Sequence, residues 1–299
     1  MLQRARRALL VVAVAVGVLT PSFGWAARND ISLLGLGDPN TQAAQDRFKA
    51  LSGELALVLA PRPLQPGETL GLSGFEVSIA NSWSSISSGQ AYWQGQPGSP
   101  ILEGGNAGRQ VPGALWTPTL HVRKGLPFST EIGVQATYLS YSSLYMVGAE
   151  AKVAIHESFF RWVPSLALRA AVGRLMGSSE LDLLTLEADV VASLPIGIAG
   201  VARVTPYLGY GQMGAHVNSY VLDRTPYVVL DPSDQRGGTG GSLATFKTIY
   251  WYDNLYPRYF GGLRINTAIL ELLYEANVGV TTFGKKQVVT HTLKLGFDV

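Results

Sequence analysis

Residues Phe128–Tyr138 read Phe-Ser-Thr-Glu-Ile-Gly-Val-Gln-Ala-Thr-Tyr, and apolar side chains fill alternate positions from Ile132 to Tyr138. The positions between them carry Glu131, a glycine, Gln135 and a threonine. A β-strand points successive side chains to opposite faces, so this strand has one apolar and one polar face. The same alternation returns along most of the chain. In an exported protein it is typical of a β-barrel that turns its apolar side to lipid and its polar side to a lumen.

The alternation predicts an all-β fold, an antiparallel transmembrane β-barrel of about ten strands, with eight to twelve as the range. Twelve strands would need a further hairpin in the aromatic-rich stretch 244–256. The strands are longer than the roughly 5–6 residues usual in soluble sheets, which disfavours a soluble β-sandwich. The expected strands are Leu70–Trp83, Ala114–Lys124, Phe128–Tyr138, Tyr145–His156, Val163–Leu175, Leu181–Leu194, a seventh from Ile198 to Tyr210 or beyond, Arg258–Ile265, Ala268–Val280 and Val288–Val299.

The N-terminal region differs from the rest, and the chain divides into a signal peptide (1–26), an N-terminal segment (27–66) and the barrel (67–299). Arginines precede the apolar run Ala8–Leu19, and Gly24 and Ala26 form a small-x-small cleavage site. Apolar residues from Ala44 to Leu59 recur at three- and four-residue spacings, which predicts an amphipathic helix. We expect a periplasmic helix packed at the barrel mouth, with a plug inside the lumen as the alternative.

Composition limits the function classes. The chain has no cysteine, which excludes disulfides and thiolate metal sites. Its net charge of +2 implies no nucleic-acid-binding surface. Charged residues make up 15% of the chain and glycines number 34, which suits a barrel with an uncharged lipid face and a narrow lumen.

The chain resembles the outer-membrane β-barrel proteins of Gram-negative bacteria from Leu70 to the C-terminus. The resemblance rests on the alternation, the signal peptide, the long loops alternating with tight turns, and the closing run Leu293–Phe297. It implies residence in the cell outer membrane after export with a cleaved signal peptide. It also implies outer-membrane lipid, lipopolysaccharide and the barrel-assembly machinery as partners. The stretch Leu34–Asn40 resembles a part of plugged hydrophobic-substrate channels.

Charged residues fall at the inward positions of the expected strands, and acids nearly balance bases. Buried ions of opposite sign must pair, so we expect a polar network that locks the lumen, with a polar pathway for small solutes as the alternative. The expected lumen-facing residues are Glu76, Arg123, Glu131, Glu150, Lys152, Arg169, Glu187, Asp189, Arg203, Arg264, Glu271, Glu275 and Lys294.

Aromatic residues near the strand ends predict interfacial girdles. They are Trp83, Trp116, Tyr138, Tyr145, Trp162, Tyr250, Trp251, Tyr256, Tyr259 and Phe260. The alternative is a sugar- or lipid-binding platform for Trp93 and for the run Tyr250–Tyr252.

Enzymatic chemistry has little support in the sequence. No metalloprotease or nucleophile-elbow motif occurs, and His216 with Ser219 is the one candidate pair for a lipid hydrolase. Calcium in the loop Asp223–Gly241 does not match an EF-hand, and we expect neither cofactor nor metal. The sequence favours passive transport of small or hydrophobic solutes, as in a porin-like protein, or a structural surface role. A lipid-modifying barrel enzyme is the alternative.

Overall fold

The computed structural model describes residues 29–96, 99–102, 111–157, 163–198, 201–223, 243–267, 269–282 and 285–298. The expected signal peptide lies outside them. Two helices and one 3-10 turn accompany the strands: η1 (Leu33–Leu36), α2 (Gln42–Leu59) and α3 (Ala91–Gln94). The strands are β1 (Phe75–Ser85), β2 (Ala114–Leu126), β3 (Thr130–Tyr138), β4 (Tyr145–His156), β5 (Ser165–Met176), β6 (Leu181–Ser193), β7 (Ile196–Ile198), β8 (Ala202–Ser219), β9 (Leu222–Asp223), β10 (Leu243–Ala244), β11 (Leu255–Asn266), β12 (Leu270–Val280) and β13 (Gln287–Asp298).

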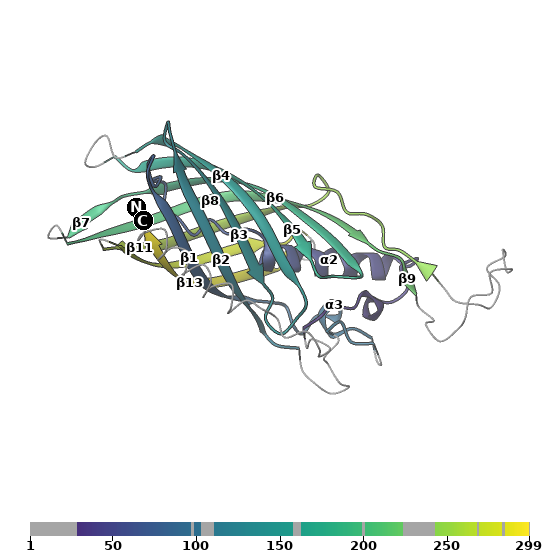
Figure 1. The fold of residues 1–299 in the computed structure, drawn as a ribbon. Coiled ribbons are helices and arrows are strands. Elements are labelled where there is room, and N and C mark those ends of the chain that lie inside the picture. The colour runs from purple at the N-terminus through teal and green to yellow at the C-terminus, as the bar shows by residue number, and fades with distance from the viewer. Residues whose placement is uncertain are drawn as a thin grey trace, which may run out of the picture.

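Ten antiparallel strands close into a barrel (Figure 1), which confirms the predicted fold class and strand number. Neighbours in sequence pair as hairpins, β13 pairs with β1, and β8 pairs with β11. Two corrections apply to the expected seventh strand. It begins at Ala202 and continues to Ser219, and Ile196–Ile198 forms a short hairpin partner for its first residues instead of a turn. The stretch 244–256 adds no strand pair to the wall among the described residues.

The two ends of the barrel differ. One end holds the connections that follow β1, β3, β5, β8 and β12, including both long ones, and we name it the loop end. The other, the turn end, holds the connections after β2, β4, β6 and β11, where β1 also begins and β13 finishes. No helix among the described residues is long and apolar enough to cross a membrane.

The outer wall is apolar. On β6, Leu186 and Val190 point outward and are 52% and 43% exposed, while Glu187 and Asp189 between them are buried. On a closed barrel, such exposed aliphatic rows are typical of the face that contacts lipid. Some expected girdle residues, among them Trp83 and Trp116, are exposed on this wall, whereas Tyr256 and Phe260 point inward and are buried, which corrects their expected place. Their positions on β11 share the inward face with Arg258.

The N-terminal segment passes through the barrel. Asn29 donates its backbone N–H to Tyr141 in the β3–β4 turn at the loop end. Helix α2 then enters the barrel, beside α3 at the loop end (Figure 1). The following extended residues 60–70, here named the strap, continue to the turn end, where Leu70 donates its backbone N–H to Glu131. We name residues 29–70 the plug, because they lead from the loop end through the lumen to the turn end.

The expectation of a helix at the periplasmic mouth is therefore wrong, and the alternative, a plug, describes the structure. The helix itself was predicted from its apolar spacing, which gives a buried face without saying what buries it. Thr41 caps the helix by accepting a hydrogen bond from the Ala44 N–H at 3.3 Å. Gly53 does not interrupt α2; a Cβ there would lie 3.0 Å from the hydroxyl of Tyr256, so the glycine lets the helix approach the wall.

Candidate functional site

The lumen has two zones, and the loop-end zone is apolar. Helix α2 fills it with side chains that are almost completely buried, including Phe48, Leu51 and Leu55. The inward side chains of the surrounding strands are apolar at the same level and belong to one core with the helix: Leu115, Met146, Leu175, Leu183, Met213, Val217 and Val288. The loop-end zone is thus packed like the interior of a soluble protein.

The turn-end zone is charged. Seven carboxylates and seven cations are buried there on the strands and the strap: Glu76, Glu131, Glu150, Glu187, Asp189, Glu271, Glu275, and Arg62, Arg123, Lys152, Arg169, Arg258, Arg264, Lys294. Because the two signs balance in number, the zone has no excess of one formal charge that would select one sign of ion.

The ion pairs run around the wall from strand to strand. Lys294 lies 2.6 Å from Glu76 and 2.7 Å from Glu271, and Arg123 contacts Glu76 in turn. On the other side, Arg169 binds Glu150 at 2.7 Å. Arg169 also contacts Asp189 and Glu187, and Arg258 contacts Glu187. Most of these contacts join neighbouring strands, and Arg258 of β11 reaches Glu187 of β6 past β8. The contacts offset the several kcal/mol that removal of an ion from water costs.

The strap is bound into this network, and Gln65 is its centre. The amide oxygen of Gln65 accepts hydrogen bonds from Arg123 at 2.5 Å and from Lys152 at 2.7 Å, and its nitrogen donates to Glu150 at 3.0 Å. Backbone groups of the strap take part as well. Leu64 donates its N–H to Glu275 at 3.2 Å and accepts from Lys294 at 2.9 Å. The strap therefore supplies hydrogen bonds that the wall residues would otherwise lack.

Two glycines of the wall make room for the strap. Gly148 on β4 and Gly173 on β5 are directly opposite each other. A Cβ on either would lie 2.7 or 2.8 Å from ring carbons of Pro61, closer than side-chain atoms pack. The proline ring thus lies directly against the β4–β5 backbone.

Twelve of the thirteen residues expected to face the lumen are buried within it. Arg203 shares the inward face of β8 but lies near its turn-end start, where its side chain is 59% exposed and 3.9 Å from Glu68. Sequence reasoning missed Arg62, Gln65 and Arg258. The position of Arg258, an even number of residues before Arg264 on one strand, was a usable signal for it. Arg62 and Gln65 lie among prolines without periodicity and gave none.

A buried carboxylate joins the plug to the loop end. Glu54 of α2 accepts hydrogen bonds from the Tyr92 hydroxyl and the Trp93 indole N–H, each at 2.7 Å, and from the Ser87 N–H at 3.0 Å. Burial and the hydrogen bond to Glu54 raise the pKa of the Tyr92 phenol well above its ordinary value. Trp93, which the sequence offered for a binding platform, is instead fully buried against the helix.

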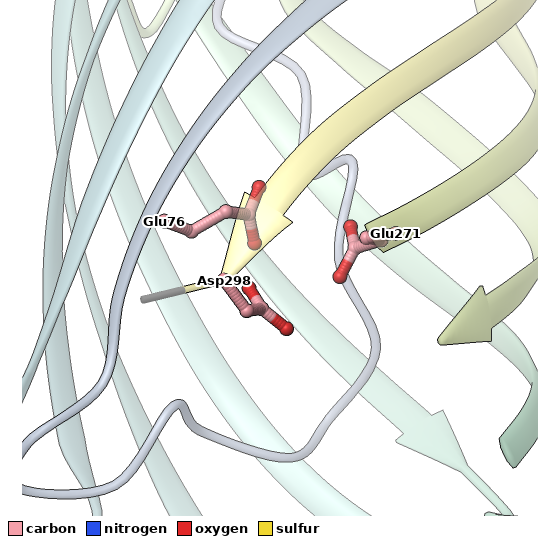
Figure 2. A group of neighbouring side chains, drawn as sticks. All are labelled: Glu76, Glu271 and Asp298. Carbon is pink, nitrogen blue, oxygen red and sulfur yellow. The ribbon is translucent and has the colours of Figure 1, made fainter. Parts of the chain in front are cut away.

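Three carboxylates approach one another near the turn end. Glu76, Glu271 and Asp298 come from β1, β12 and β13 and place oxygen atoms within 4.8 Å of each other (Figure 2). Lys294 bridges the two glutamates, and Asp298 accepts a hydrogen bond from Asn266 at 3.1 Å. Lys294 thus supplies a shared counter-charge to the two glutamates.

The candidate hydrolase pair is not assembled. His216 and Ser219 are three positions apart on β8 and so belong to opposite faces. The His216 ring lies 3.1 Å from the Asn218 amide, and the Ser219 hydroxyl accepts from the Phe246 N–H at 2.7 Å. The aspartates proposed for calcium in the loop after β9 lie outside the described residues, apart from the backbone of Asp223.

The closed sheet, the apolar wall and the charged interior define the class: this is an antiparallel transmembrane β-barrel, and its lumen is occupied by its own chain. No protein-family model and no curated protein matches the sequence. Solved structures that are similar to it are outer-membrane barrels.

Three of them illustrate the likeness. An outer membrane channel from Pseudomonas putida F1 is 12% identical over 81% of this chain and 100% of its own, with a TM-score of 0.36. LpxR from Salmonella typhimurium is 14% identical over 75% of this chain and 99% of its own, with a TM-score of 0.34. Ail, the attachment invasion locus protein of Yersinia pestis, is 11% identical over 76% of this chain and 99% of its own, with a TM-score of 0.27. At these TM-scores the likeness carries no inference about activity.

Proposed function

We propose that this chain is a non-enzymatic barrel of the Gram-negative outer membrane, closed by its own N-terminal plug, with a structural, surface-exposed role. The observation that carries this is the path of the plug, which leads from the loop end through the lumen to the turn end. Closed barrels of even strand number with short turns at one end are typical of that membrane. By the same rule the loop end faces outward. The barrel-assembly machinery and outer-membrane lipid are then its expected partners.

The free energy gained by burying the apolar side chains of α2 favours a plug that stays in place over one that acts as a gate. Six apolar side chains of α2 are at most 3% exposed: Phe48, Leu51, Leu55, Leu57, Val58 and Leu59. At about 1.5–3 kcal/mol each, their burial contributes on the order of 10–20 kcal/mol, as an upper estimate. Moving a two-state equilibrium from one side to the other takes about 5.5 kcal/mol of differential binding. The binding of a small solute does not offset the burial free energy that is lost when the helix leaves the lumen.

Gated transport of hydrophobic solutes is the second candidate, and the apolar loop-end zone favours it. If α2 left, the inward residues of this zone, such as Met146 and Leu183, would line an apolar vestibule. The turn-end zone would remain charged. An enzymatic role has less support, since no nucleophile and base converge at His216 and Ser219.

The experiment is single-channel conductance of the refolded chain in planar bilayers, with a reversible lock on the plug. The Cγ of Leu57 lies 3.2 Å from where a Cβ on Gly279 would stand, which suits a disulfide in the variant L57C/G279C. The chain has no other cysteine to interfere.

We expect no steady current from the intact chain, whether the lock is oxidised or reduced. Deletion of residues 29–65 should produce current if the shortened barrel folds. Current from the intact chain that disappears on oxidation of the lock would overturn the structural role and establish gated transport. Because the lock is read on the full-length protein, the test does not depend on the folding of the deletion.

A further inference from the structure

A mixed patch of charged and aromatic side chains lies on the outer wall at the loop end. Arg174 on β5 is opposite Leu184 on β6, and Leu184 is opposite His216 on β8, so these residues form one row across three strands. Asp182 belongs to the next row toward the loop end. We name this row, together with Asp182 and the run Tyr250–Tyr252, the outer patch.

The aromatic part of the patch is ordered and open. The rings of Tyr250 and Tyr252 are parallel within 1° at 5.4 Å, and they are 44% and 75% exposed. His216 packs against Trp251 at 5.4 Å and against Tyr250 at 5.5 Å. Trp251 covers Gly214 on β8, where a Cβ would lie 3.2 Å from the Cβ of the tryptophan. The cluster is thus docked on the wall, and both tyrosines are exposed among the described residues.

The charged part of the outer patch is the pair Arg174 and Asp182, and Arg174 can exchange Asp182 for another anion. The Arg174 side chain is 57% exposed, and its Nε lies 3.3 Å from Asp182. An exposed pair of this kind contributes about 1 kcal/mol or less, so a phosphate can displace the carboxylate. Guanidinium groups bind phosphate through two parallel charge-assisted hydrogen bonds. Arg174 therefore offers a phosphate site in the same row as His216, two strands away from it.

The wall identifies the kind of ligand. On the same outward face of β6, Leu186 and Val190 continue from the patch toward the turn end and are exposed. A ligand on the patch would lie with an apolar part on this wall and a polar head at the patch. Amphipathic aromatic rings suit that interfacial level. Sugar rings offer flat C–H faces to tyrosines, and a phosphate would bind Arg174.

We propose that the outer patch binds the head group of a phosphorylated glycolipid of the surrounding leaflet. This rests on the outer-membrane location proposed above. Sugars stack on Tyr250 and Tyr252, the phosphate binds Arg174 in place of Asp182, and the acyl chains lie along β6.

The test measures binding of purified lipid A to the detergent-folded protein by native mass spectrometry, with phosphatidylglycerol as the competing lipid. We expect lipid A to be preferred. R174Q should weaken it about tenfold, the loss of one charge-assisted contact. Y252A should weaken it as well, whereas D182N should strengthen it because the guanidinium is released. Y274A is the control, since Tyr274 is also an exposed outer-wall tyrosine, 44% against 75% for Tyr252, and lies beside a histidine, His291.

Equal binding of both lipids, with R174Q and Y252A no different from Y274A, would reduce the patch to an ordinary interfacial girdle and overturn the proposal. That result would leave the proposed membrane location of the barrel unaffected. A chain that stays folded and soluble without detergent would instead overturn the membrane location, so the two failures are distinguishable.

Discussion

Arg169 is a fully buried cation with three acidic neighbours on adjoining strands. It binds Glu150 at 2.7 Å and contacts Glu187 and Asp189. The arrangement holds only while all members are present, because each charge is compensated by the others. Removing the arginine leaves three carboxylates facing one another out of water.

R169M should therefore lower the free energy of unfolding by about 3–5 kcal/mol, the usual cost of breaking a buried pair. R174M removes the same kind of side chain from an exposed pair and should cost about 1 kcal/mol or less. Urea titration of the two variants in detergent measures both. Equal losses would contradict the view that the lumen network is desolvated.

Tyr92 gives the loop end a dependence on alkaline pH. Its raised pKa means that the folded chain favours the neutral phenol, which donates to Glu54. The stabilisation is complete below the ordinary tyrosine pKa of about 10 and is lost as pH rises through the raised value. The native chain should thus exceed Y92F in stability by about 1 kcal/mol at pH 8. The difference should shrink above pH 10 in urea titrations of the two chains, and a constant difference would argue against this linkage.

At the scale of elements, the strands were predictable and the plug was not. Alternation placed Glu150 and Arg169 inside the barrel because the strand period admits only two faces. The spacing in α2 likewise predicted a helix with one buried face. Nothing in that spacing distinguishes a barrel mouth from a lumen, since both cover an apolar stripe. The strap follows neither the strand period nor the helix period. Its partners are distant in sequence, as the hydrogen bond between Gln65 and Lys152 shows.

The contact between strap and wall makes a prediction about glycine. G173A would place a methyl group 2.8 Å from the Pro61 ring and should lower the free energy of unfolding by about 1–3 kcal/mol, as overpacking does. Gly197, in the short β7 hairpin, has no atom within 4 Å of such a methyl group, so G197A is the matched control with little expected change. Thermal unfolding of both variants is the measurement. A neutral G173A would mean that the strap is free to shift.

At the scale of the whole molecule, the plug fixes which parts of the chain share an end. Asn40, just before α2, lies with the loops, whereas Ser73, just before β1, lies with the short turns. About 30 residues of sequence thus separate two positions on opposite sides of a membrane roughly 30 Å thick.

Single-cysteine variants test this arrangement directly, because the native chain has no cysteine. In intact cells N40C should react with a membrane-impermeant maleimide, whereas S73C should react only after the outer membrane is permeabilised. Both positions are exposed, so accessibility alone does not explain a difference. Labelling of S73C and not N40C in intact cells would mean that the turn end, and not the loop end, faces outward.

The path of the N-terminal segment also sets the order of assembly. The barrel is a ring, closed where β13 pairs with β1, and the segment that leads into β1 runs through its middle like the axle of a rotaxane. Because α2 packs tightly in the loop-end zone, we expect the seam between the first and last strands to close around a helix, about 10 Å in diameter, that is already in place. To leave the closed ring, α2 would have to give up this packing.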